Sequence, residues 1–264
     1  MLTITDAQIN AWMALLLWPF MRIFGLFLAD PFFSSGSISV TVRVGFTLLL
    51  TVLIAPVLPA MPNVPVLSAV GIMIAVNQMI IGLMIGMAMR LVFSAVEMAG
   101  HVAGLQMGLG FASFFDPQHN TSVPVLAQFL SLMTTLLFLA MNGHLIVLRT
   151  LIESFTQMPP TAEPLSARPL MLLVNQGAII FTVGLQLSMP VVGSLLVTNL
   201  AVGVMTRASP QLNIFAIGFP IMLMIGMGSL YLTLPAMPHQ VQLLIDGYTR
   251  FVNAMMLGLP PGAR

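Results

Sequence analysis

One helical face carries the three side chains of this sequence whose types and spacing could do chemistry. Arg90, Glu97 and His101 are separated by seven and four residues, so a helix through them places all three on the same side. Such a polar stripe could face a pore, a proton path or a partner, because charges at membrane depth are costly unless paired or hydrated. The structural alternative is an Arg90–Glu97 pair buried against neighbouring helices, and the sequence leaves both interpretations open.

The sequence gives little support for a metal site or for an enzymatic reaction. His101 has no second and third ligand at suitable spacing, so we expect no metal site. The chain lacks the GxxxxGKS/T phosphate-binding motif, and its seven acidic residues are scattered. The absence of cysteine excludes disulfides and thiolate chemistry. We therefore expect a non-enzymatic protein without a cofactor.

Composition predicts a protein that is embedded in a membrane. Of 264 residues, 58% are hydrophobic and 6% are charged, against roughly 25% charged in an ordinary soluble domain. Charged residues at this frequency are too few to cover a water-exposed surface. Most of the surface must therefore face lipid or other protein. With a net charge of +1 and no basic run, nucleic acid is not an expected partner.

The chain divides into apolar segments of about the 20 residues that a membrane-spanning helix needs. We predict an all-α integral membrane protein with about six such segments arranged as helical hairpins, at residues 11–29, 44–61, 66–89, 123–148, 171–205 and 211–234. Residues 240–257 predict a C-terminal amphipathic helix, because Leu244, Tyr248 and Phe251 share one face. The N-terminus lacks the basic start of a signal peptide, so we expect the first segment to be retained. Loop arginines, four on one side and three on the other, do not fix the orientation.

Small residues repeat along the segment that carries the polar stripe. Gly100, Gly104 and Gly108 recur every four residues, and such a face lets two helix backbones approach closely. We expect this helix to be packed by other helices rather than by lipid. Gly82 and Gly86 form a second, weaker instance of the pattern.

A glycine- and phenylalanine-rich block follows the small-residue repeat. It reads GLGFASFFDP and ends in Asp-Pro, which terminates any helix. Irregular backbone at membrane depth is tolerated only inside protein or beside a water-filled cavity. The block therefore predicts either a loop that closes a channel or an ordinary interhelical connection. We interpret most of the 23 methionines as lipid-facing or core residues. Met107, beside this block, is the exception, and we assign it to the loop.

Three stretches resemble a known family. They are GLQMGLGFASFFDP at 104–117, FLAMNGH at 138–144 and ASPQLNIFAIGFP at 208–220, and WPFMRIFGLFLADPFF at 18–33 also fits. In this order, they resemble the FliR family of flagellar biosynthesis proteins, and the resemblance covers nearly the whole chain. The first and third blocks are closer to the flagellar branch than to the related subunit of virulence-type injection systems.

The resemblance implies a subunit of the flagellar type III export gate in the bacterial inner membrane, within the flagellar basal body. The implied partners are FliP, FliQ and FlhB, unfolded export substrates and membrane lipid. A member of this family is present as a single copy in the assembly. The whole chain, residues 1–264, would form one membrane domain. Residues 1–165 would be similar in shape to FliP and residues 166–264 to FliQ.

The resemblance also implies a plug. The loop would close the channel in its resting state, and Gly108 and Gly110 would let it swing aside. The expected plug residues are Gly104, Gln106, Met107, Gly108, Gly110, Phe111, Phe114, Phe115, Asp116 and Pro117. Energy would come from the proton gradient and a separate ATPase. Two other classes stay open, a small-molecule secondary transporter using the polar stripe and a membrane scaffold without a gating role.

Overall fold

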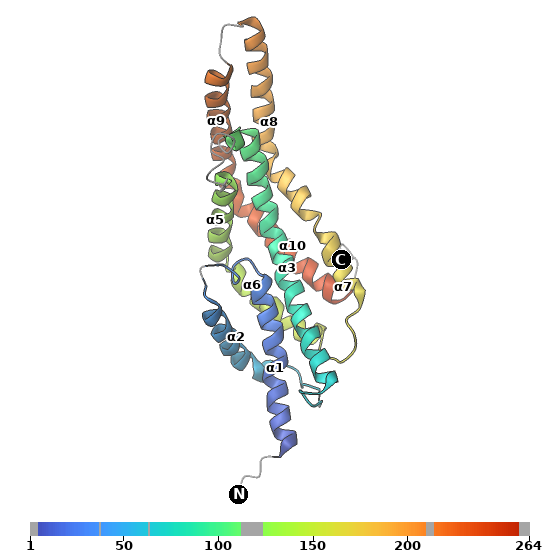
Figure 1. The fold of residues 1–264 in the computed structure, drawn as a ribbon. Coiled ribbons are helices and arrows are strands. Elements are labelled where there is room, and N and C mark those ends of the chain that lie inside the picture. The colour runs from blue at the N-terminus through green and yellow to red at the C-terminus, as the bar shows by residue number, and fades with distance from the viewer. Residues whose placement is uncertain (1–4, 37, 63, 112–123, 210–213, 259–264) are drawn as a thin grey trace. The chain divides into compact units, whose positions relative to one another are not determined.

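Every regular element in the described part of the chain is a helix. The computed structural model describes residues 5–36, 38–62, 64–111, 124–209 and 214–258. The α-helices are α1 (Asp6–Ala29), α2 (Val40–Ile54), α3 (Ala69–Gln106), α5 (Val125–Ala140), α6 (Gly143–Gln157), α7 (Ala167–Gln176), α8 (Ile179–Ala208), α9 (Ile214–Thr233) and α10 (Met237–Met256) (Figure 1). Short 3-10 turns are η1 (Ala55–Val57), η2 (Leu109–Phe111) and η3 (Leu234–Ala236).

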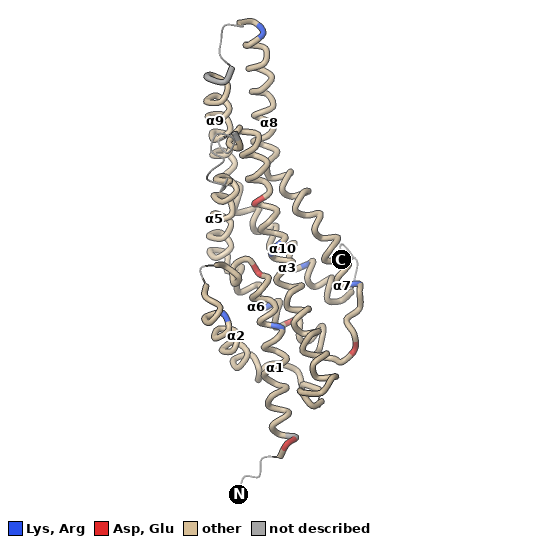
Figure 2. Tube along the Cα trace, viewed as in Figure 1, with Lys and Arg blue, Asp and Glu red and all other residues tan. Residues whose placement is uncertain are grey.

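In the described residues, five helical stretches are long and apolar enough to cross a membrane. They are Gln8–Ala29, Val40–Val57, Ala69–Gln106, Ala167–Ala208 and Ile217–Met256. The bent pair of α5 and α6 makes a sixth if it counts as one span. Charged residues are widely spaced along the chain, as Figure 2 shows. The predicted all-α fold with about six apolar segments is confirmed.

Two segment boundaries differ from the sequence-based prediction. The segment predicted at residues 66–89 does not end there, because α3 continues without interruption through the polar stripe to Gln106. The segment predicted at residues 123–148 is not one straight helix, because α5 and α6 meet at an angle of 68°. Asn142 adopts φ 58° at this break, a left-handed conformation that asparagine tolerates better than most residues.

The chain forms two compact units, each made of several chain segments. Unit 1 comprises Met1–Leu91, Asn142–Gly177 and Ile245–Arg264, and unit 2 comprises Val92–Met141 and Ala178–Leu244. Helices pair as hairpins within each unit: α1 packs against α2 in unit 1, and α8 runs beside α9 in unit 2 (Figure 1). The expected division at residue 165 concerns likeness in shape to two other proteins and stays a prediction.

In unit 1, α1 and α3 cross at glycines. A Cβ atom added at Gly82 would overlap the backbone carbonyl of Arg22, and one at Gly25 would overlap that of Met79. At Gly86 the added atom would lie 2.6 Å from the carbonyl oxygen of Leu26. The two backbones are therefore in contact along the crossing, as small residues at this spacing allow. The pair Gly82 and Gly86 looked like the weaker small-residue pattern in the sequence. At Gly82 it nevertheless makes a closer helix–helix contact than Gly100 does.

The C-terminal amphipathic helix is α10. Its residues Tyr248, Phe251 and Met255 are buried, whereas Asp246 and Arg250 are exposed. Helical spacing thus separates an inward apolar face from an outward polar one.

Candidate functional site

The start of the predicted gating loop is fixed by the way in which α3 ends. Gly108 has φ 81°, the left-handed conformation that commonly terminates a helix and that favours glycine. The Met107 N–H donates to the Ala103 carbonyl at 3.0 Å, and the Gly108 N–H donates to the Leu105 carbonyl at 3.0 Å. Gly108 therefore does not extend the helical small-residue face, because the chain leaves the helix at this residue.

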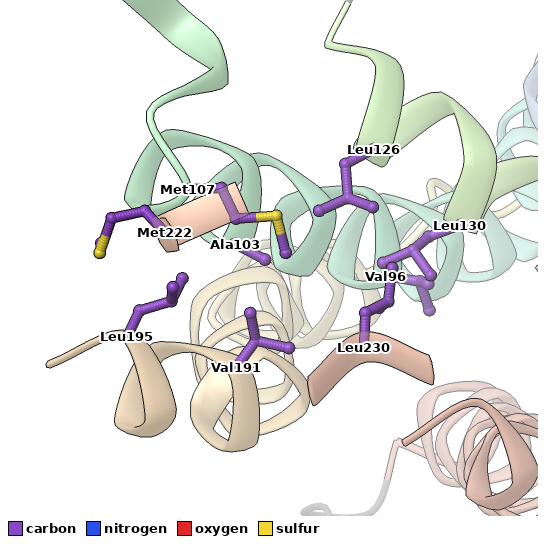
Figure 3. Packing of buried hydrophobic residues seen from close by; sticks show 9 residues of the cluster. All are labelled: Val96, Ala103, Met107, Leu126, Leu130, Val191, Leu195, Met222 and Leu230. Carbon is purple, nitrogen blue, oxygen red and sulfur yellow. The ribbon is translucent and has the colours of Figure 1, made fainter. Parts of the chain in front are cut away.

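Met107 is anchored in the core of unit 2. Its side chain is fully buried, and it belongs to a cluster of apolar residues from α3, α5, α8 and α9 (Figure 3). The cluster consists of Val96, Ala103, Met107, Leu126, Leu130, Val191, Leu195, Met222 and Leu230. The last side chain before Gly108 is thus part of a core to which four helices contribute.

The other end of the loop is tied to the same helix. A Cβ atom at Gly100 would overlap the backbone of Ala127 near the start of α5, so α3 and α5 touch there. One turn later, an added atom at Gly104 would lie 3.7 Å from the Leu126 Cβ, which is ordinary contact. The end of α3 and the start of α5 therefore meet at one helix–helix contact.

Only part of the predicted plug lies in the described residues. Gly104 is buried, and Gln106, Gly108 and Gly110 are half-buried. Phe111 ends η2. Four predicted plug residues lie outside the described residues, namely Phe114, Phe115, Asp116 and Pro117.

The polar stripe lies on one face of α3, as predicted from its spacing. Arg90, Glu97 and His101 are all exposed. Within the described ranges no hydrogen bond or ion pair joins Arg90 to Glu97, so the alternative of a pair buried within this chain does not hold. The stripe faces out of the chain, where a partner, lipid or water can reach it.

Sequence reasoning missed a buried arginine that bonds three helical segments together. Arg22 in α1 is fully buried and donates to Gln78 Oε1 at 2.8 Å, to Ser154 Oγ at 2.9 Å and to the Met158 carbonyl at 2.6 Å. Its guanidinium also lies 4.1 Å from the ring centre of Phe155. Arg22 therefore joins α1, α3 and the end of α6. The signal was its isolation in an apolar segment, since a charge placed there needs partners.

A buried carboxyl lies just beyond the end of α1. Asp30 Oδ1 accepts hydrogen bonds from the backbone N–H groups of Phe32 at 2.9 Å and Phe33 at 3.1 Å. Its other oxygen, Oδ2, is buried and has no hydrogen-bond partner among the described residues. Burial raises the pKa of this carboxyl to about 6, against the two backbone hydrogen bonds, which lower it. The turn after α1 is therefore sensitive to pH.

Comparison with known proteins identifies the family. The model of the bacterial export proteins, family 1, matches residues 13–248. The flagellar biosynthetic protein FliR of Pectobacterium carotovorum subsp. carotovorum is 40% identical over 90% of this chain and 91% of its own length. FliR of Escherichia coli strain K12 is 40% identical over 89% and 90%, and FliR of Bacillus subtilis strain 168 is 29% identical over 76% and 79%. The resemblance seen in the three sequence blocks is thereby confirmed, and the chain belongs to the FliR family of bacterial flagellar export proteins.

Proposed function

We propose that this chain is a non-enzymatic subunit of the flagellar type III protein export gate. With FliP and FliQ, and beside FlhB, it forms the channel through which unfolded flagellar proteins cross the bacterial inner membrane at the basal body. Family membership supports the export role, because the relatives are named as flagellar biosynthetic proteins. Residues 1–165 then correspond to the FliP-like part and residues 166–264 to the FliQ-like part.

The apolar surface of the α8–α9 hairpin supports assembly with other helices. Val197, Leu200 and Met224 are 70, 72 and 73% exposed, although they lie in apolar helices. Gly193 and Gly203 of α8 have no atom within 4 Å of an added Cβ. A helix that offers glycines together with large apolar side chains suits close packing against a second helix as well as lipid.

The base of the loop at residues 104–117 is the observation that carries the gating role. Met107 is fully buried, whereas Gly108 adopts a left-handed conformation immediately after it. A segment that is anchored at its base and starts at a glycine in this conformation is suited to two positions, and a gate needs only a few kcal/mol between them. In the closed position the loop blocks the channel with Phe111 and Phe114, whereas Met107, which the sequence placed in the plug, is buried and anchors the base of the loop.

The placement of the polar stripe disfavours the transporter alternative. A secondary transporter places its substrate site at discontinuous helices near the middle of the membrane. Arg90, Glu97 and His101 instead lie exposed on the uninterrupted helix α3. A shortened loop distinguishes the scaffold alternative from a gate. Shortening the loop of a gate makes the membrane leak ions, whereas in a scaffold it affects only assembly.

Purification of the tagged chain from membranes, followed by mass measurement of the intact complex, tests the assembly. We expect one copy of this chain with several copies of two other small membrane proteins, FliP and FliQ. A monodisperse monomer or homodimer that is stable without those partners would contradict the proposal and favour the transporter.

A further inference from the structure

The turn after α1 and helix α10 each bury a side-chain oxygen that has no hydrogen-bond partner among the described residues. The two atoms are Oδ2 of Asp30 and the hydroxyl oxygen of Tyr248. Asp30 is fully buried, Tyr248 is 2% exposed, and both belong to unit 1. Buried polar atoms are nearly always satisfied, by protein or by a bound molecule, so these two oxygens require an explanation.

Asp30 and Tyr248 interact across this part of unit 1. Among the described residues, Asp30 is the charged group that acts electrostatically on Tyr248. No direct hydrogen bond joins the two side chains, because both oxygens are without a partner. A single water between them satisfies both atoms, since buried waters bond to two or more polar groups. The pair can therefore link the end of α1 to α10.

The surroundings of Asp30 are apolar. The rings of Phe27 and Phe33 stack with their centres 4.4 Å apart, and Phe33 also donates its N–H to Asp30 Oδ1. On α3, a Cβ atom added at Gly86 would lie 2.8 Å from the Asp30 nitrogen, so this helix brings backbone and no side chain to the turn. A carboxyl in such surroundings favours its neutral form, because its charge loses hydration.

No counter-ion offsets this preference. The titratable or charged groups that the surrounding elements carry are Arg22 of α1, Arg43 of α2, Arg90 of α3, His144 of α6 and Tyr248 of α10. Arg22 and Arg43 donate to other acceptors, and Arg90 is exposed. The raised pKa of Asp30 has burial as its main cause, and the opposing causes are its two backbone hydrogen bonds.

We propose that Asp30 and Tyr248 form a buried proton-binding site that joins the end of α1 to α10. One proton from solvent adds to Asp30 Oδ2, and the new O–H bond is the only covalent change. In the ionised state the Tyr248 hydroxyl donates towards the carboxylate through the bridging water. In the protonated state the carboxyl donates towards the Tyr248 oxygen through the same water.

A proton fits this site better than a metal ion does. Calcium and magnesium take about six or more oxygen ligands, whereas the site offers two side-chain oxygens. The part of the chain that the structure describes also contains no group of three His, Cys, Asp or Glu residues that could hold a metal ion. The inference goes beyond the export function and does not depend on a gating role of residues 104–117.

Infrared difference spectroscopy detects the bound proton directly. The sample is the full chain purified from membranes with the subunits that accompany it, labelled with carbon-13 aspartate so that aspartate carboxyl bands are identified by their isotope shift. We expect the band of a protonated aspartic acid at about pH 5, lost with a midpoint of about 6. Asp30→Asn should remove this band, and Asp6→Asn, at the exposed start of α1, should leave it unchanged. An Asp30 that is fully ionised at pH 5 would overturn the proposal.

Removal of one hydroxyl tests the part played by Tyr248. In Tyr248→Phe the carboxylate loses a hydrogen bond to a charged group, and such bonds are roughly twice as strong as neutral ones. We therefore expect the midpoint to rise by about one pH unit. Tyr231→Phe is the matched control, because Tyr231 is 74% exposed, and its midpoint should not change. Equal midpoints in the two variants would show that Tyr248 does not belong to the site.

Thermal unfolding of the same variants separates a hydrogen-bonded Tyr248 from one that is merely buried. A buried hydroxyl without a partner destabilises the fold, so its removal would raise the melting temperature. The proposal predicts that Tyr248→Phe instead lowers it, and more so at pH 8 than at pH 5. A higher melting temperature at pH 8 would overturn the proposal.

Repeating the infrared titration in sodium chloride and in choline chloride distinguishes a proton from a sodium ion. A midpoint that is the same in both salts supports a proton site. A midpoint that falls as sodium rises would overturn the proposal, because it would show a metal cation competing for Asp30.

Discussion

The crossing of α1 with α3 in unit 1 and the contact of Met107 with Gly226 in unit 2 use glycine for different purposes. In the crossing, Gly25 and Gly82 bring two backbones into contact, and buried Arg22 bonds three helical segments together. In unit 2, the three atoms nearest to a Cβ added at Gly226 of α9 all belong to the Met107 side chain. Backbone contact cannot be broken without separating helices, whereas an unbranched thioether side chain can change its rotamer. The same residue type thus builds a fixed frame in one unit and makes room for a flexible side chain in the other.

A side chain in the crossing has the largest expected effect. Gly82→Ala drives a Cβ into the carbonyl of Arg22, and neither backbone can yield without separating the helices. Because the overlap is with backbone, we expect a destabilisation well beyond the usual overpacking cost of about 1–3 kcal/mol, with loss of folded protein. Thermal unfolding of the purified assembly measures it. Gly45→Ala is the control, since nothing lies within 4 Å of an added Cβ there. If both variants melt alike, the crossing is not a rigid frame.

Removal of the buried guanidinium should also weaken the frame. Arg22→Met keeps an unbranched side chain but leaves the acceptors on Gln78, Ser154 and Met158 without their donor. We expect a loss of about 3–5 kcal/mol, as when one partner of a buried charged network is removed. Arg149→Gln breaks an exposed pair with Glu153, which is worth at most about 1 kcal/mol. Similar melting of the two variants would show that Arg22 is not a structural centre.

The turn after α1 should make unit 1 sensitive to pH. The folded pKa of Asp30 is about 6, above the usual value of 3.8, so the folded state favours the protonated carboxyl. Its stabilisation is complete below pH 3.8 and is lost as pH rises through 6. The loss amounts to about 3 kcal/mol. Asp30→Asn should remove this pH dependence from unfolding measured between pH 4 and pH 8. A variant that keeps the same slope would locate the pH dependence elsewhere.

The smallest expected effect belongs to the loop pivot. Gly108→Ala places a side chain at φ 81°, which costs about 1–2 kcal/mol. We expect the assembly to form normally and the export rate to change, because the strain falls on the loop and not on the crossing. Complex yield and secretion of a flagellar substrate measure the two effects separately. If the variant fails to assemble but each assembled complex exports normally, Gly108 supports the structure in the same way as the glycines of the α1–α3 crossing.

Local patterns predicted the elements but not their tertiary contacts. The apolar segments and the amphipathic face of α10 follow from hydrophobic periodicity, which acts within a few residues. The partners of Arg22 lie 56, 132 and 136 residues away in the sequence, so no local pattern could reveal them. The break at Asn142 carried an Asn-Gly signal inside an apolar stretch, and the continuous hydrophobicity obscured it. The glycine repeat at Gly100 predicted a close approach but not its partner, Ala127.

We propose that residues 104–117 form a movable gate on a fixed base. The most direct test is the ion permeability of membranes that carry the assembly with residues 108–115 deleted, beside the same membranes with the unmodified protein. We expect the complex to form with the same subunit composition and its membranes to leak small ions. Membranes that stay tight around a correctly assembled complex would contradict it.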